Sequence, residues 1–466
     1  MEADKCSAGL RQLFAASLVA KFWKILSLKR PALCFSMLFP FGLGLSMGSN
    51  WISSIYLTST THALAVYFQG VASILRDKLI KQGLPDWRPL FEAFIILLLV
   101  FMPVLNSWAT ILPLLMLLWL GGDGRVHPLA KELAVFWIAM MVSAVFSGGL
   151  KAGSRDFTNY SSWLLIAYWS GKTFSGHFPK KILYFLVYSC LLWLGIGWMQ
   201  QWAGVPTPPG WLEPEQRGFI TVRSYSVFGN PNIFALYILM MMVFTCYLIS
   251  DSLRLASKNL WIHKLLLIFI LICNLISLYS TYSRFAWLLG ILFLLCWFWP
   301  ISGKWFQPVI LLIPFLLLML PGFKIRLAGL VTLTDSSLGY RIRIWQAVSK
   351  AIADFWLWGS GPGSFTTIYP WYQIQNTISA HAHQLFLQLW LENGIFSLVV
   401  FLWLAWSMVK GCFTDYGMAK TLALTLLIFL GYGLVETWSQ NHVLGGYFWF
   451  FCGLWISLKD GEFITE

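Results

Sequence analysis

The chain has 466 residues, of which 58% are hydrophobic and only 11% are charged. Soluble domains carry about 45–50% apolar and about 25% charged residues, so this composition excludes a soluble globular protein. Many apolar runs approach the about 20 residues that a helix needs to cross a bilayer. A single anchor on a soluble enzyme is therefore excluded as well, and the sequence predicts an all-α polytopic membrane protein.

Positive charge is the second strong feature of the sequence. The 32 Lys and Arg outnumber the 19 Asp and Glu, which gives a formal net charge of +13. In a membrane protein such an excess is explained by the positive-inside rule, so we expect no nucleic-acid partner. The eight cysteines are scattered without a Cys-x-x-Cys pair, which indicates neither a disulfide framework nor a zinc site.

Breaks at Gly, Pro and charged residues divide the apolar sequence into about 12–14 expected transmembrane helices. The weakest span is the second, because Thr58–Thr61 and His62 interrupt it. The basic N-terminus precedes the first span without a nearby cleavage signal and is typical of an uncleaved signal anchor. The expected spans lie near residues 32–49, 56–74, 89–104, 107–120, 133–150, 158–172, 182–200, 231–250, 264–281, 285–300, 305–320, 384–408, 421–436 and 441–457.

The connecting segments differ in their content of Lys and Arg. Alternate segments that include both termini hold 22 of the 32 basic residues. Because the basic loops of a membrane protein stay in the cytoplasm, we expect both termini there. The other set of segments then faces outward.

Two outward segments stand out. Residues 200–230 are rich in proline and end at Gly229-Asn230-Pro231-Asn232, a favoured helix start. Residues 321–383 are the only long polar stretch, and connections of that length are usually functional or disordered. Their many aromatic residues favour a folded cap. The sequence thus divides into transmembrane helices over 1–320, a large outer loop or cap over 321–383, and C-terminal transmembrane helices over 384–466.

Outward arginines are candidate anion ligands. Arg284 lies in Ser280-Thr281-Tyr282-Ser283-Arg284 between two apolar runs, where a charged residue suggests a functional site. A snorkelling arginine is the alternative. Arg223, Arg341 and Arg343 also lie in outward segments, and guanidinium groups bind phosphates through paired donors. Each of these could instead be a solvated loop charge.

Two histidines lie together where the outer loop meets the next span. His381 and His383 belong to Ser379-Ala380-His381-Ala382-His383-Gln384, and an imidazole is suited to take a proton from a hydroxyl at neutral pH. A metal site is the alternative, but no nearby Asp, Glu or Cys completes a ligand set, so we expect no metal.

Two glutamates in or near the last spans are harder to interpret. Glu392 follows His383 by nine residues. On a helix this spacing is half a turn off and about 13 Å away, which excludes a direct partner. Glu392 and Glu436 either have partners inside the protein or face water near helix ends.

A glycine-rich segment, Gly359-Ser360-Gly361-Pro362-Gly363-Ser364-Phe365, follows a polar stretch of the outer loop. No strand is expected before it and no Lys-Ser/Thr follows it, so a turn that shapes the cap is favoured over a phosphate loop. No ATP motif is visible either. The energy for any reaction would come from an activated substrate or an ion gradient.

Three outward segments, in this order, resemble the O-antigen ligase and polymerase family of bacterial cell envelopes. The resemblance covers roughly residues 220–400, and Arg223–Asn232 is similar to a cyanobacterial branch that includes proteins labelled as bicarbonate transporters. The three segments are Ser283-Arg284-Phe285-Ala286-Trp287, Gly339-Tyr340-Arg341-Ile342-Arg343-Ile344-Trp345 with Gly359–Phe365, and His383-Gln384-Leu385-Phe386-Leu387-Gln388 with Glu392-Asn393-Gly394.

This resemblance implies a GT-C-like fold in the bacterial inner membrane, without a cofactor, and a role in lipopolysaccharide or other polysaccharide biosynthesis. The implied reaction is a metal-independent, inverting glycosyl transfer at the periplasmic face. Its donor would be an undecaprenyl-diphosphate-linked glycan, and its acceptor a lipid A-core sugar or a growing polysaccharide. Ligase and polymerase action both stay open.

The resemblance also implies roles for individual residues. His383 would be the general base, while Arg284 and Arg341 would bind the diphosphate and stabilise its charge. Further candidate substrate-binding residues are Arg223, Arg343, Gln384 and His381. Gln384 stands where the family usually has Asn.

Two other classes of function compete with this hypothesis. Outward arginines also fit a transporter of bicarbonate or another anion, although neither an internal repeat nor paired half-helices are visible. The second competitor is a non-catalytic scaffold for envelope assembly.

Overall fold

The computed structural model describes residues 96, 99–104, 130–147, 154–173, 180–207, 222–254, 261–299, 336–374, 377–412 and 417–459. The expected spans near 32–49, 56–74, 107–120 and 305–320, most of the span near 89–104, and the proposed signal anchor lie outside these residues. Residues Met1–Thr60 and Thr61–Glu466 form two separate units, and every described residue belongs to the second.

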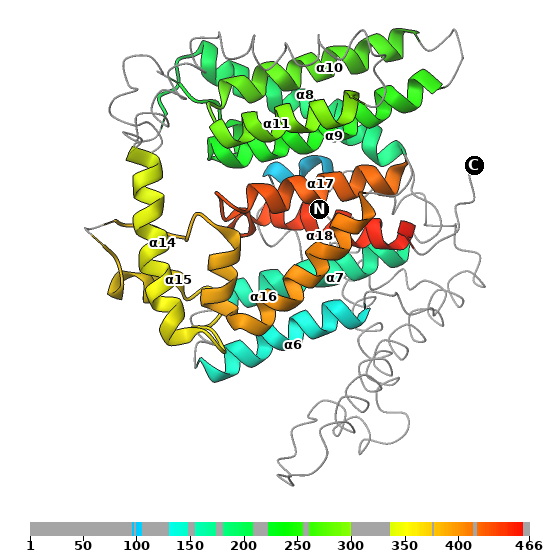
Figure 1. Cartoon of the computed structure of the whole chain (residues 1–466). Helices are drawn as coiled ribbons and strands as arrows, with labels where there is room; N and C mark the ends of the chain where they lie inside the picture. The colour runs from blue at the N-terminus through cyan, green and yellow to red at the C-terminus, as the bar shows by residue number, and fades with distance from the viewer. Residues whose placement is uncertain are drawn as a thin grey trace, which may run out of the picture. The chain divides into compact units, whose positions relative to one another are not determined.

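Every regular element in the described part of the chain is a helix (Figure 1). The all-α polytopic architecture is thereby confirmed. The elements are η1 (Met102–Val104), α6 (Ala130–Phe146), α7 (Ser154–Thr173), α8 (Lys181–Trp202), η4 (Ser226–Phe228), α9 (Pro231–Arg254), α10 (Trp261–Ser280), α11 (Arg284–Phe298), α14 (Ser336–Phe355), α15 (Phe365–Ile368), η6 (Tyr369–Trp371), α16 (Leu385–Gly411), α17 (Met418–Tyr432), η7 (Trp438–Gln440) and α18 (His442–Lys459).

Helices occupy the nine predicted spans that fall within the described residues. Four of these helices, α8, α9, α10 and α16, are long and apolar enough to cross a membrane. The apolar parts of α6, α11, α17 and α18 are shorter. The expected total of 12–14 spans depends partly on residues outside the described ones and stays a prediction.

Helix α9 is the centre of the bundle. Its residues from Ile233 to Cys246 are all buried inside the protein, and the helix is apolar on every side, as is typical of a core helix or a membrane span. It packs against α8, α10, α11 and α17. Its first turn, which carries the candidate site residue Asn232, is therefore held rigidly.

Small residues allow α7 and α18 to pack closely. A Cβ atom at Gly453 would lie 1.9 Å from the carbonyl oxygen of Ala167, so only glycine fits there. The hydroxyl of Ser170 on α7 donates to the carbonyl of Phe450 on α18 at 3.0 Å. Glycine at helix–helix contacts is typical of helix packing in membranes, and so are hydrogen bonds that hydroxyl groups make from one helix to another.

Helix α16 is interrupted at Gly394. This residue has φ 75° and ψ 175°, a conformation that favours glycine. A Cβ atom there would lie 2.3 Å from the carbonyl oxygen of Leu357. The segment after α14 therefore packs directly against the interruption, and Leu385–Asn393 lies against the outer loop.

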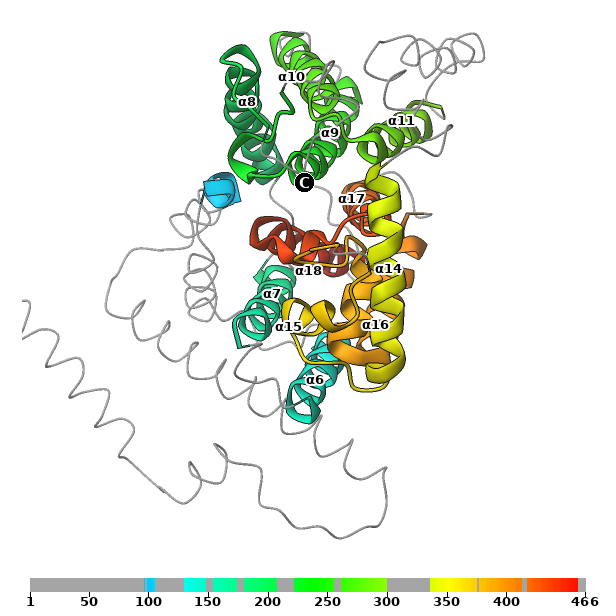
Figure 2. The ribbon, with the colours of Figure 1, turned by 90° about the vertical axis from the view of Figure 1, so that its left-hand side faces the viewer.

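The described part of the outer loop packs around a second hydrophobic core, which it shares with Leu391 of α16. The cap is defined here as residues 336–374 and 377–383. One face of α14 contributes residues spaced i, i+3, i+4, i+7 and i+8, and Figure 2 shows α14 running beside α16. The core consists of Ile344, Ala347, Val348, Ala351, Ile352, Phe365, Tyr369, Ala382 and Leu391.

The close contact of α7 and α18 gives a stability prediction. Gly453→Ala should lower the free energy of unfolding by about 1–3 kcal/mol, because the added methyl overlaps the backbone of α7. Gly195→Ala in α8 is the matched control, since nothing lies within 4 Å of a Cβ atom there. Thermal unfolding in detergent should show a lower Tm for Gly453→Ala alone. Equal Tm values for the two variants would contradict the packing.

Candidate active site

The two histidines lie where the cap meets α16. Gln384 is the N-cap residue of this helix, and its side-chain oxygen accepts a hydrogen bond from the backbone N–H of Leu387. His383 has φ 50°, a left-handed conformation that costs a non-glycine residue about 1–3 kcal/mol and is common at functional sites. The surrounding contacts must therefore stabilise this backbone.

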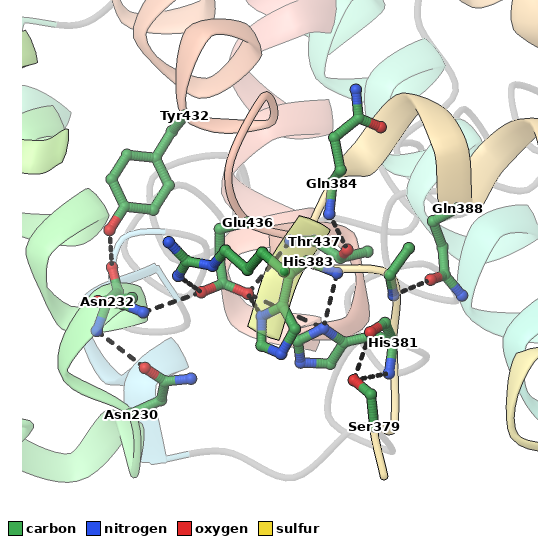
Figure 3. Close-up of polar contacts among 12 residues, drawn as sticks. Asn230, Asn232, Ser379, His381, His383, Gln384, Gln388, Tyr432, Glu436 and Thr437 are labelled. Carbon is green, nitrogen blue, oxygen red and sulfur yellow. Dashed lines mark hydrogen bonds and ion pairs between the residues drawn. The ribbon is translucent and has the colours of Figure 1, made fainter. Parts of the chain in front are cut away.

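Glu436, in the turn after α17, lies at the centre of the cluster (Figure 3). Its Oε1 is 3.2 Å from Nδ1 of His383 and 3.9 Å from Nδ1 of His381. Its Oε2 accepts a hydrogen bond from Nδ2 of Asn232 at 3.0 Å and is 3.9 Å from Nη2 of Arg341. The carboxylate is only 2% exposed, and a buried charge needs such partners.

The charge of Glu436 determines the tautomer of His383. Burial alone raises the pKa of the Glu436 carboxyl, but the hydrogen bond with His383 and the positive charge of Arg341 hold it well below its ordinary value. An ionised carboxylate only accepts hydrogen bonds, so Nδ1 of His383 carries a proton. The neutral imidazole then has its lone pair on Nε2, where it can act as a base.

His381 has a different protonation state and role. Burial lowers the pKa of His381 to about 4. Its Nδ1 accepts a hydrogen bond from the backbone N–H of His383 at 3.4 Å, and the two rings are 4.1 Å apart. His381 is therefore neutral at pH 7 and supports the backbone of His383.

Arg223 is a buried residue rather than a solvated loop charge. Only 7% of it is exposed. Its Nε donates to the carbonyl of Thr281 at 2.9 Å, and its Nη2 donates to Oδ1 of Asn232 at 3.2 Å. Because the same Asn232 amide donates to Glu436, Arg223 orients a partner of the central carboxylate.

The start of α9 is the one predicted from Asn-Pro. Oδ1 of Asn230 accepts a hydrogen bond from the backbone N–H of Asn232 at 2.8 Å, and α9 begins at Pro231. This confirms Asn230 as the N-cap residue. This helix start places the side chain of Asn232 beside Glu436 (Figure 3).

Arg284, the first residue of α11, is connected to the cluster through its neighbour. The hydroxyl of Ser283 is 3.0 Å from the hydroxyl of Tyr432, which donates to the carbonyl of Asn232 at 3.0 Å. The backbone at Arg284 is thereby held beside the first turn of α9.

Arg341 and Arg343 lie on different sides of α14. Residues two apart on a helix point about 200° apart, so only one of them can face the cluster. Arg341 faces Glu436, whereas Arg343 is close enough to Tyr369 in the cap to affect its titration. Gln384 is predicted from the sequence to bind substrate. Its side chain caps the N-terminus of α16 and is directed away from the histidines (Figure 3).

Three potential metal ligands meet in this cluster. One ligand atom from each of His381, His383 and Glu436 lies within 4.8 Å of the others. The sequence argument against a metal assumed that no carboxylate was near the histidines, and Glu436 overturns that premise. Against a metal, Nδ1 of His381 already accepts the backbone N–H of His383, and Arg341 neighbours the carboxylate.

Residues 267–402 match the O-antigen ligase family. The family resemblance drawn from the sequence motifs is thus confirmed, while the cyanobacterial branch stays a prediction. No curated protein matches the sequence at a significant level.

The segment that matches O-antigen ligases includes Arg284, Arg341 and His383, but two central residues of the cluster lie outside it. Glu436 follows His383 by 53 residues, and Asn232 precedes His383 by 151 residues. No local sequence motif therefore joins the three residues. An acidic residue at the end of an apolar span was the only sequence signal for Glu436. The Asn-Pro-Asn motif indicated a helix start and gave no sign of a contact with Glu436.

The protonation of His381 predicts the pH dependence of stability. Between pH 6.5 and about 4 the unfolded chain binds a proton at this residue and the folded protein does not, so stability falls as the pH is lowered through that range. The depressed pKa of Glu436 adds a loss at lower pH. His381→Asn keeps an acceptor but does not titrate, so its Tm should fall less than that of the wild type between pH 6.5 and 4. An equal fall in both proteins would contradict this assignment.

Proposed function

We propose that this protein transfers a glycan from an undecaprenyl-diphosphate carrier to a sugar hydroxyl, with inversion and without a metal. The observation that carries the proposal is the hydrogen bond between His383 and the buried carboxylate of Glu436, with Arg341 beside the same carboxylate. The match to the O-antigen ligase family supports glycan transfer in polysaccharide biosynthesis.

His383 is the proposed general base. As the acceptor oxygen attacks the anomeric carbon, its proton passes to Nε2 of His383, while the bond from that carbon to the diphosphate oxygen breaks. Glu436 stabilises the imidazolium that forms, in the way a carboxylate assists a catalytic histidine. A single displacement from the face opposite the diphosphate inverts the anomeric carbon.

Arg341 and Arg284 are the proposed ligands of the departing diphosphate. The two electrons of the broken bond remain on the diphosphate, and a fixed guanidinium stabilises this developing charge. Arg343 stays a proposed contact to substrate farther into the cap. The sequence predicts that Arg223, His381 and Gln384 bind substrate, but their contacts favour positioning roles. Arg223 positions Asn232, His381 positions the backbone of His383, and Gln384 caps the start of α16.

The proposed location is the bacterial inner membrane, with both termini in the cytoplasm. The distribution of basic residues supports this orientation, and it places the cap and Glu436 at the periplasmic face. A lipid-linked donor and a glycan or glycolipid acceptor could both reach a site at the membrane surface.

Glycan transfer by purified protein in nanodiscs tests the base. His383→Ala should lower kcat about 10²–10⁴-fold, the usual loss on removing a general base. Glu436→Gln should lower kcat by a smaller factor, because the imidazole remains but loses its ionic partner. Gln373→Ala, an exposed cap residue, is the control and should match the wild type.

Full transfer by His383→Ala would contradict the proposed chemistry. Transfer by neither the wild type nor any variant, together with bicarbonate flux into proteoliposomes that Arg341→Ala abolishes, would support the transporter instead.

Metal removal gives a separate test. Since the proposed base and leaving-group ligands are all side chains, transfer should be unchanged after EDTA treatment and on addition of Zn²⁺ or Mg²⁺. Loss of transfer in EDTA that one of these ions restores would instead assign His381, His383 and Glu436 as metal ligands.

A further inference from the structure

Both peptide units that flank Ala382, the residue between the two histidines, are held by side chains. The backbone N–H of Ala382, in the unit that joins it to His381, donates to Oε1 of Gln388 at 2.7 Å. Its carbonyl, in the unit that joins it to His383, accepts from Nε1 of Trp345 at 3.0 Å. Gln388 belongs to α16 and Trp345 to α14. Ala382 is fully buried, so water cannot replace either bond.

Gln388 is in turn bound to Glu392 one helical turn further along α16. Nε2 of Gln388 donates to Oε1 of Glu392 at 2.8 Å, and both side chains are 1% exposed. A peptide N–H only donates, so the oxygen of the Gln388 amide must accept from Ala382. The amide nitrogen is thereby left to donate to Glu392.

Glu392 connects this pair to the glycine turn of the cap, residues 359–364. The side-chain Oε1 of Glu392 accepts a hydrogen bond from the backbone N–H of Phe365 at 3.1 Å. The backbone carbonyl of Glu392 accepts a hydrogen bond from the backbone N–H of Gly361 at 2.9 Å. A Cβ atom at Gly359 would lie 2.5 Å from the carbonyl oxygen of Glu392. The turn is thus seated directly on α16.

These contacts form one continuous relay from the glycine turn to Ala382, the residue before His383. His383 has a left-handed backbone, which persists only where the surrounding structure fixes it. Because Gln388 fixes the backbone of Ala382, it also helps to fix the direction in which the imidazole of His383 leaves the chain towards Glu436. Figure 3 shows Gln388 on the other side of the histidine segment from Glu436.

We propose that Gln388 and Glu392 are positioning residues for His383, and that their relay couples the seating of the glycine turn to the alignment of this base. This inference rests on the proposed function for the role of His383, and it adds two residues that do not contact the reacting atoms. The relay needs a donor and an acceptor at each step, so it can be broken by one substitution and restored by a second.

Gln388→Glu breaks the relay. Glutamate can still accept from Ala382, but it has no amide N–H to donate to Glu392, and repulsion opposes the ionisation of both buried carboxyl groups. Glu392→Gln keeps the relay, because the new amide oxygen accepts from both Gln388 and Phe365. The double variant Gln388→Glu/Glu392→Gln restores it with the direction reversed, since the amide of residue 392 then donates to the carboxylate of residue 388.

The experiment compares these three variants with the wild type and with Gln373→Glu, the same change at an exposed cap position. Two quantities are measured in nanodiscs: kcat and KM for glycan transfer, and backbone hydrogen exchange in the peptides covering 359–365 and 377–384. Peptides from α9 report whether the bundle itself remains folded.

For Gln388→Glu we expect kcat to fall about 10²-fold, the effect of misplacing a catalytic group by about 1 Å, with KM little changed. Exchange should rise in both cap peptides together and stay unchanged in α9. Glu392→Gln, the double variant and Gln373→Glu should stay within about tenfold of the wild-type kcat, a loss of at most about 1.4 kcal/mol in activation free energy. Their exchange should match the wild type.

A double variant no more active than Gln388→Glu alone would overturn the proposal, because it would show a merely structural need for glutamine. Wild-type kcat in Gln388→Glu would overturn it as well. If the wild type itself transfers no glycan, the proposed function fails. Backbone hydrogen exchange then still tests whether the glycine turn is coupled to the segment that carries His383. Exchange in 377–384 that rises in Gln388→Glu and returns in the double variant would support the relay, and any other pattern would overturn it.

Discussion

The buried carboxylate of Glu436 is the charge on which the arrangement of the site depends. A carboxylate with 2% exposure is costly to bury unless several donors compensate for the lost water. Here hydrogen bonds come from the first turn of α9 and from the segment before α16, and Arg341 of α14 in the cap adds a positive charge at 3.9 Å. Removal of the charge would leave these three parts of the fold without a common partner, so the carboxylate fixes their relative positions and the electrostatics of His383.

The cap is held onto the transmembrane helices by polar contacts as well as by the small hydrophobic core that it shares with Leu391 of α16. Arg341 reaches Glu436 on one side, and the glycine turn is seated on α16 at Glu392 on the other. Hydrogen bonds require defined angles and distances, whereas apolar packing alone tolerates small shifts. The polar contacts at both ends therefore explain how a loop with few core residues can present a base in a fixed orientation.

The chemistry that this arrangement favours is the activation of a hydroxyl beside an anionic leaving group. The imidazole of His383 donates to a carboxylate and has its free lone pair on the opposite nitrogen, while guanidinium groups lie nearby at Arg341 and, through Asn232, at Arg223. A base beside a cationic group fits the proposed transfer from a lipid diphosphate better than it fits passage of a free anion, because ion passage has no use for a general base.

The sequence by itself determined the all-α membrane architecture, the helix start at Asn230 and the pairing of His381 with His383, because these features follow from hydropathy and from residues close together in the chain. It also identified Arg341 and the glycine turn by their patterns. The tertiary structure decided that Glu436 is the partner of His383, that Arg223 is buried and that Arg343 faces away from the cluster. These depend on contacts between residues far apart in the chain, such as Asn232 and Glu436, and on the direction of each side chain around its helix, which local spacing does not encode.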